Sequence, residues 1–171
     1  MNNTADATGD AILSDFKRQT LENAINYYEK VKKSNAQTDV QENWLNCAST
    51  IIWATTTMEG FLSNLISEKH GHHNYASLII NHDFGFTKKI DFLKREFSID
   101  VRINNEWPNI EQTVWNRNDI MHFNIATTNL MTSDNAKNAM QACQDLIKLL
   151  KIGFAIPQLH PFYESFLVKV F

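Results

Sequence analysis

The chain is poor in the residues that cross-link or interrupt a polypeptide: its 171 residues include two cysteines, three prolines and five glycines. Two cysteines do not make a disulfide framework. Cys47 and Cys143 both fall on apolar faces of expected helices, where a free cysteine behaves as a small buried hydrophobe. The sequence also lacks a glycine-rich phosphate loop, an internal repeat, a serine nucleophile motif and an acidic cluster at metal-binding spacing.

Long apolar runs and a basic leader are missing as well. The N-terminal stretch MNNTADATGD carries Asp6 and Asp10, has no basic region and is followed by no long apolar segment. We therefore expect neither a signal peptide nor a transmembrane span, and we expect a cytoplasmic protein without a membrane partner.

An excess of positive charge is also absent. The formal net charge is -3 and the pI is about 6.0. Between residues 87 and 122 the lysines and arginines are offset by as many acidic residues. This balance excludes a broad basic surface for nucleic acid, so an RNA partner would need a focused site, expected to be built by two chains.

Helical periodicity dominates the rest of the chain, and the length suits a single domain. We expect a flexible N-terminal tail over residues 1–12, followed by one helical domain over 13–171 that includes an apolar C-terminal tail. The fold class is all-α, a four- to five-helix up-and-down bundle. The expected helices are Ser14–Lys33, Val40–Lys69, Thr87–Phe97, one beginning near Pro108 or Asn109 that carries an arginine and a histidine, and Ser133–Ile152.

The second expected helix is the longest and carries the core seam. Its apolar positions alternate three and four residues apart, which is typical of a bundle. These positions are Trp44, Ala48, Ile51, Thr55, Met58, Leu62 and Leu65. Gly71 is expected to end this helix, while Thr87 and Ser133 are expected N-caps for later helices. The lysines of the helix that follows Thr87 are expected to face water.

Two further segments have no regular pattern. His70, His72, His73 and His82 lie in a stretch that we expect to be a solvated loop, because no cysteine accompanies them and their spacing fits no familiar metal motif. We accordingly expect no metal and no cofactor. The C-terminal tail from Pro157 is apolar, and it is expected either to pack across the bundle or to contact a partner.

The segment WNRNDIMHFN carries the chemistry. Arg117 presents a fixed fork of N–H donors that suits a phosphate, and His122 can give or take a proton near neutral pH. Asn116, Asn118 and Asp119 add polar groups to a helix that Ile110, Val114, Ile120 and Met121 would otherwise make an ordinary buried one. Such a cluster indicates a phosphodiester-cleaving site or, alternatively, a structural hydrogen-bond network.

Helix geometry limits how this pair can act. Five residues turn an ideal helix through roughly 500°, so Arg117 and His122 are expected to point about 140° apart and not to share a face. Asn118 and Asp119 are close enough to orient the imidazole. His122 would deprotonate a ribose 2'-hydroxyl or protonate the 5'-oxygen leaving group, while Arg117 stabilises the phosphorane. The products would be a 2',3'-cyclic phosphate and a 5'-hydroxyl.

The pattern Arg-Asn-x-x-x-His, formed by Arg117, Asn118 and His122 near the end of the penultimate long helix, resembles the HEPN superfamily of helical domains. The likeness also covers the helix order from Ser14 to Ile152. It implies a metal-independent endoribonuclease, or a degenerate RNA-binding or scaffold relative, from a toxin, antiphage or stress system. It further implies a homodimer whose two motifs face each other.

Two positions refine this resemblance. One HEPN group pairs with a nucleotidyltransferase antitoxin and has a tyrosine two positions after the histidine, where this chain has Asn124. The acidic residue that some members place on the second long helix corresponds to Glu59.

Two alternatives stay open. In the first, Arg117, Asp119 and His122 form a dimer-interface network without catalysis. In the second, the chain is an antitoxin or immunity subunit, with an operon-encoded partner protein that binds its apolar tail. The tail residues concerned are Phe162, Phe166, Leu167, Val168 and Val170.

Overall fold

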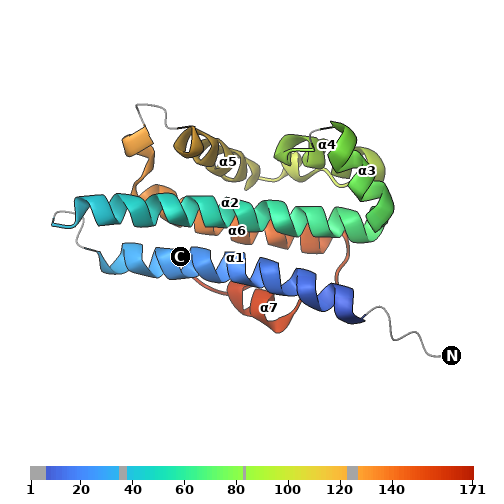
Figure 1. The fold of residues 1–171 in the computed structure, drawn as a ribbon, viewed down its shortest axis with the longest axis horizontal. Helices are drawn as coiled ribbons and strands as arrows, with labels where there is room; N and C mark the ends of the chain where they lie inside the picture. Colours follow the sequence, from blue (N-terminus) through green and yellow to red (C-terminus); the bar gives the residue numbers. More distant parts are fainter. Residues whose placement is uncertain (1–6, 35–37, 83, 123–126) are drawn as a thin grey trace.

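The structure is a computed structural model that describes residues 7–34, 38–82, 84–122 and 127–171; at 7–17, 80–82, 127 and 128 it describes the backbone only. Within these residues the chain is all-helical, as the sequence predicted, with no strand (Figure 1). The elements are α1 (Ala7–Lys33), α2 (Val40–His70), α3 (His72–His82), α4 (Phe86–Phe97), the 3-10 helix η1 (Val101–Ile103), α5 (Trp107–Met121), the 3-10 helix η2 (Thr127–Leu130), α6 (Ser133–Gly153) and α7 (Pro161–Leu167).

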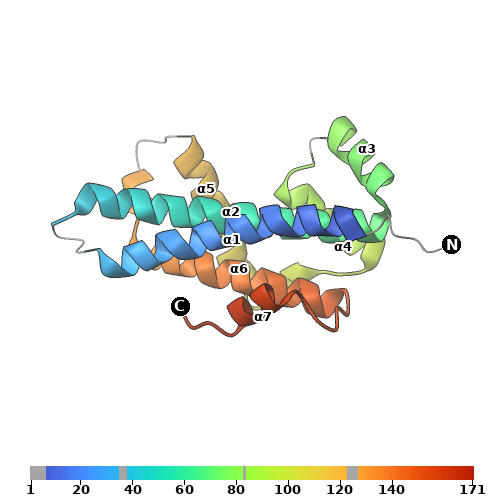
Figure 2. The ribbon, with the colours of Figure 1, turned by 60° about the horizontal axis from the view of Figure 1, so that its bottom comes forward.

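Four helices make up the body of the molecule. Helix α2 lies in the middle and packs most extensively on α1 and α6, while α5 contacts both α2 and α6. Followed along the chain, α1, α2, α5 and α6 alternate in direction (Figures 1 and 2). Helices α3 and α4 lie together near the carboxyl end of α2, and α7 lies against α6. None of the described helices is long and apolar enough to cross a membrane.

The expected seam of α2 forms the centre of the core. From Ala48 to Leu65 its positions are buried. The polar Thr55 is tolerated there because its hydroxyl donates to the Ile51 carbonyl at 2.9 Å, so no buried donor is left unsatisfied. Trp44 is the exception, since it is 40% exposed. It lies in the first turns of α2, where Val40 and Leu45 are exposed too.

Both cysteines are free and buried, as predicted: Cys47 lies on α2 and Cys143 on α6. The apolar stripe of α6 is fully buried around the second of them.

The residues that begin and end the helices agree only in part with the prediction. Gly71 ends α2 with a φ of 92°, a left-handed conformation that glycine adopts at low cost, as predicted. The expected N-caps were each wrong. Thr132, not Ser133, caps α6 by accepting a hydrogen bond from the Asn135 backbone N–H at 3.1 Å. Gly85, not Thr87, precedes α4, and no side chain caps that helix.

Two segments are more helical than the sequence suggested. Helix α1 begins at Ala7 instead of Ser14, so the expected tail over residues 1–12 overlaps it. The expected loop was wrong, because residues 72–82 form α3, although His72 and His73 are exposed as expected for a solvated segment. The reason is apolar contact on one side of the segment: Tyr75 is buried with its ring 6.0 Å from that of Phe84.

The apolar C-terminal segment packs on its own bundle, the first of the two expected outcomes. Tyr163 and Phe166 of α7 are buried. Gln144 of α6 fixes the segment by donating to the carbonyls of Phe166 at 2.8 Å and Lys169 at 3.0 Å. Phe166 is therefore not available to a partner protein as the antitoxin alternative required, whereas Val168 and Val170 are exposed.

Candidate functional site

Helix α5 positions the candidate site. Its apolar side, with Ile110, Val114 and Ile120, is buried against the bundle, and a proline stands in its first turn. Met121, which the sequence placed with that buried set, is 54% exposed, because it is the last residue of the helix. Asn116 is buried and accepts a hydrogen bond from Gln112 at 2.8 Å, so this part of the polar cluster is structural.

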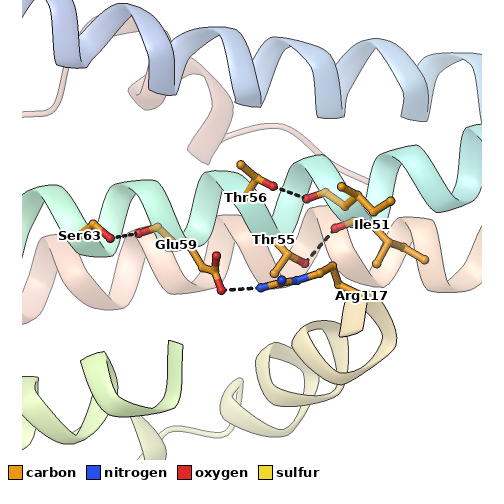
Figure 3. A network of polar contacts seen from close by, with 7 residues as sticks. Ile51, Thr55, Thr56, Glu59, Ser63 and Arg117 are labelled. Carbon is orange, nitrogen blue, oxygen red and sulfur yellow. Dashed lines mark hydrogen bonds and ion pairs between the residues drawn. The ribbon is translucent and has the colours of Figure 1, made fainter. Parts of the chain in front are cut away.

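Arg117 leaves α5 on the side that faces α2. Figure 3 shows its side chain extending past Thr55 to Glu59, with which it forms an ion pair through Nη2. The two side chains are 25% and 30% exposed. The Nε donor of Arg117 is buried and has no hydrogen-bond partner among the described residues. The structure thus brings together two predicted site residues that lie far apart in the sequence.

A hollow of about 530 Å³ opens beside this ion pair, between α5 and the first turn of α4, and we call it the Arg117 hollow. Its wall joins groups of complementary chemistry: a carboxylate, basic and neutral polar side chains, and apolar surface. The wall residues are Glu59, Gly85, Phe86, Thr87, Lys88, Val114, Arg117, Asn118 and His122. Arg117, Asn118 and His122 therefore border one space in a single chain.

His122 borders this hollow from the carboxyl end of α5. It is the exposed residue that ends α5, with φ −90° and ψ 6°, and its backbone N–H donates to the Asn118 carbonyl at 3.0 Å. The expected angle of about 140° between Arg117 and His122 stays a prediction. Both residues nevertheless border the same hollow.

The amino end of α4 supplies a further feature of the wall. Gly85, which precedes the helix, has no side chain and α4 has no side-chain cap. Backbone N–H groups in the first turn of a helix lack intrahelical partners, and the helix dipole makes this end positive. Gly85, Phe86, Thr87 and Lys88 present this turn to the hollow. An anion in the hollow would therefore be stabilised from α4 as well as from Arg117.

Lys89 belongs to the same polar environment and was missed by the sequence reading, which placed the lysines of this helix in water. It is half-buried, and burial lowers its pKa. Glu59 opposes that effect by raising the pKa of Lys89, and Arg117 adds to it. Burial also raises the pKa of Tyr75, with Glu59 contributing in the same direction. Glu59 thus pairs with Arg117 of α5 and also influences the pKa of Tyr75 on α3 and of Lys89 on α4.

Two other residues of α5 lie on its solvent side. Asp119, a predicted supporting residue, is exposed and is not part of the hollow's wall. Trp115 is 56% exposed and lies three residues before Asn118 and seven before His122, which places these residues on one face of the helix. The sequence reading did not single out Trp115. Its spacing from the motif was the available indication.

The histidine segment does not form a cluster around one point. His72 Nδ1 lies 2.6 Å from the Ser67 hydroxyl, whereas His70 packs its ring edge-on against Phe92 with the ring centres 5.0 Å apart. Over the described part of the chain, no three His, Cys, Asp or Glu residues lie where they could hold one metal ion together. Asn124, the position compared with a family tyrosine, lies outside the described residues.

Comparison with known proteins adds no relative: the chain matches no family model, no curated protein and no solved structure. Function is therefore inferred from the chemistry of the Arg117 hollow.

Proposed function

We propose that this protein is an endoribonuclease that cleaves RNA in the Arg117 hollow by attack of the ribose 2'-hydroxyl. The observation that carries the proposal is that Arg117 and His122 border the same open hollow. These two residue types suffice for the reaction, because guanidinium stays charged at physiological pH and imidazole exchanges a proton near neutrality.

The reaction balances as a transesterification. The 2'-oxygen forms a bond to phosphorus while the bond from phosphorus to the 5'-oxygen breaks. His122 accepts the 2'-hydroxyl proton, and the 5'-oxygen takes up a proton as it leaves. In a dimer whose two hollows face each other, His122 of the partner subunit donates that second proton. The products are a 2',3'-cyclic phosphate and a 5'-hydroxyl.

Arg117 and α4 stabilise the charge that develops on phosphorus. A phosphorane in the hollow would lie between the guanidinium and the uncapped first turn of α4, which are both present before the substrate binds. Glu59 holds the guanidinium at the hollow through its ion pair. It also competes with the phosphate for the same N–H donors, so substrate binding includes partial replacement of Glu59 at Arg117.

The motif also supports a proposal for the fold family, the oligomeric state and the biological role. We propose an HEPN-like up-and-down bundle, a homodimer with a composite site, and a toxin, antiphage or stress role in the cytoplasm with an operon-encoded partner. The Arg-Asn-x-x-x-His pattern and the alternating directions of α1, α2, α5 and α6 support the fold assignment. The exposed Trp115 beside the motif supports a partner surface on α5.

Paired variants test the catalytic proposal. We expect His122→Ala to lower RNA cleavage by at least about 100-fold, since general acid–base catalysis contributes roughly 10²- to 10⁴-fold. We expect a similar loss for Arg117→Ala, since one donor that stabilises transition-state charge contributes roughly 10²- to 10³-fold. Arg18→Ala is the matched control for arginine, because Arg18 also pairs with a glutamate, Glu22, at 2.8 Å. His73→Ala is the control for histidine, since His73 is exposed on α3 outside the hollow. Cleavage that persists in both hollow variants contradicts the proposal.

A second candidate is an interaction module in which the polar cluster only stabilises structure. The ion pair between Arg117 and Glu59 favours it, because a half-buried arginine with a carboxylate partner is explained without catalysis. This candidate predicts that Arg117→Ala lowers the melting temperature or dissociates an oligomer, and that wild-type protein cuts no RNA. Circular dichroism and light scattering of the same variants separate the two candidates.

A further inference from the structure

A second hollow lies beside the first along α4. It has a volume of about 420 Å³, and we call it the Phe84 hollow. It is lined by Leu78, Phe84, Lys88, Asp91, Phe92 and Arg95. Lys88 is part of both walls, so the two hollows are neighbours that share one exposed basic residue.

The apolar part of the Phe84 hollow is held firmly. Phe84 is half-buried, and its ring packs edge-on against Phe92 with the ring centres 5.4 Å apart and against Tyr75 at 6.0 Å. A ring fixed in this way offers a ready surface for stacking, because little side-chain freedom is lost when a flat group binds.

The charged residues of the same hollow favour an anionic strand. Lys88 and Arg95 are exposed at its wall, and the Arg95 guanidinium lies 5.3 Å from the centre of the Phe92 ring. Arg95 Nε is also paired with Glu96 at 2.7 Å, so a phosphate would compete with Glu96 for this guanidinium. Asp91, the acidic residue of the wall, is in an ion pair with Arg102 at 2.6 Å, which offsets its charge. An aromatic surface between basic side chains is the combination that binds single-stranded nucleic acid.

We propose that the Phe84 hollow binds a nucleobase of the same RNA strand whose phosphate binds in the Arg117 hollow, with Lys88 on the phosphate between them. This inference rests on the proposed ribonuclease function and extends it. It makes the substrate single-stranded, because a base must leave a duplex stack to enter the hollow. It also gives one protomer contacts to consecutive nucleotides. Stacking reads the ring face and not the base edge, so the subsite tolerates different bases.

The test measures binding of a short single-stranded oligoribonucleotide to the full chain. A 2'-deoxy residue at the cleaved position removes the nucleophile and keeps the probe intact. In a series of such probes, one nucleotide at a time is made abasic. We expect loss of one base next to the cleaved phosphate to weaken binding on the order of tenfold. Phe84→Ala should weaken the intact probe similarly and should remove the sensitivity to that one base.

Matched variants serve as controls. Phe162→Ala removes another half-buried phenylalanine, far along the chain on α7. This variant should keep the abasic profile of the wild type, by which we mean the affinity measured for each abasic position of the probe. Lys88→Gln should weaken all probes and lower the salt dependence of binding by about one ion. Lys33 lies at the end of α1 and outside both hollows. Lys33→Gln should therefore change neither the affinity for the probes nor the salt dependence of binding.

The outcomes separate the inference from the proposed function. RNA cleavage by wild-type protein combined with equal affinity for every abasic probe overturns the Phe84 subsite and leaves the ribonuclease intact. A wild-type protein that neither binds nor cuts RNA overturns both. If Phe84→Ala fails to fold, the inference is tested by the abasic profile of the wild type and by the salt dependence of binding to Lys88→Gln. A profile without one sensitive position, or an unchanged salt dependence, then contradicts the inference.

Discussion

Glu59 has a different role in each of the two candidate functions. If Arg117 binds phosphate, Glu59 is a competitor for the same guanidinium, and if the cluster is structural, Glu59 is only its counter-ion. Its proximity to Arg117, which lies on a different helix, was anticipated only through the family resemblance. No periodicity within α2 distinguishes a glutamate that pairs with another helix from one that faces water.

Replacing this carboxylate gives a residue-scale prediction. Glu59→Gln should raise the affinity for an uncleavable RNA several-fold, because the amide no longer competes as an anion for Arg117. It should cost about 0.2–1 kcal/mol of stability, as expected for an ion pair that remains partly exposed. Glu22→Gln, which removes the partner of Arg18, is the control and should leave RNA affinity unchanged. A loss of stability with unchanged RNA affinity supports the structural alternative. The measurements are fluorescence anisotropy and urea unfolding.

Some features of single residues could be predicted from the sequence and others could not. The buried α2 seam and the Gly71 stop follow from periodicity and backbone conformation, and both were predicted. The burial of Lys89 was not, because a lysine one turn into an amphipathic helix is ordinarily solvated, and only the approach of α2 and α5 changes its surroundings. Tertiary contacts, and not the local sequence, therefore determine the burial of Lys89.

At the scale of helices, the same distinction holds. Long helices with a repeating apolar face were predicted close to their observed bounds, except that α1 begins at Ala7 instead of Ser14, whereas α3 was predicted to be a loop. Its three histidines and its asparagines are weak helix formers, so the apolar contact of Tyr75 with Phe84, just before α4, had to be known first. The sequence named Arg117 and His122 as one site, but the hollow that both border is also lined by the first turn of α4, which no spacing along the chain placed there.

Helix α7 provides a prediction on pH. The Glu164 carboxylate accepts hydrogen bonds from Lys151 Nζ at 2.6 Å and from the Leu159 backbone N–H at 2.8 Å. The bond from Lys151 and then that from Leu159 lower the pKa of Glu164 below its ordinary value of 4.5. The ionised form is therefore favoured in the fold. Its stabilisation is complete above pH 4.5 and is lost as the pH falls through the lowered pKa.

Urea unfolding from about pH 6 to about pH 3 measures this effect. The difference in unfolding free energy between wild type and Glu164→Gln should shrink on acidification, because protonation removes the charge that the variant already lacks. Parallel pH profiles for the two proteins would show that the contact of α7 with α6 does not depend on this ion pair.

At the scale of the whole molecule, the composite site that we propose requires a second copy of the chain. Trp115 is 56% exposed and Met121 54%, and both lie on the helix that carries Arg117. We expect a symmetric dimer formed mainly through α5, detected by light scattering at tens of micromolar, and we expect Trp115→Glu to shift it to monomer. Ile152→Glu, at an exposed apolar residue near the end of α6, is the control. A wild-type monomer under these conditions contradicts the composite site.

The chemistry of the cleaved ends tests the central claim most directly. Single-stranded RNA is incubated with wild-type protein, with His122→Ala and with Arg117→Ala in EDTA, and the ends of the products are identified. Proton transfer by His122 and charge stabilisation by Arg117 predict that wild-type cleavage survives EDTA and leaves 2',3'-cyclic phosphate and 5'-hydroxyl ends, while both variants are inactive. Cleavage that is lost in EDTA, returns with magnesium and leaves 3'-hydroxyl ends would contradict this account.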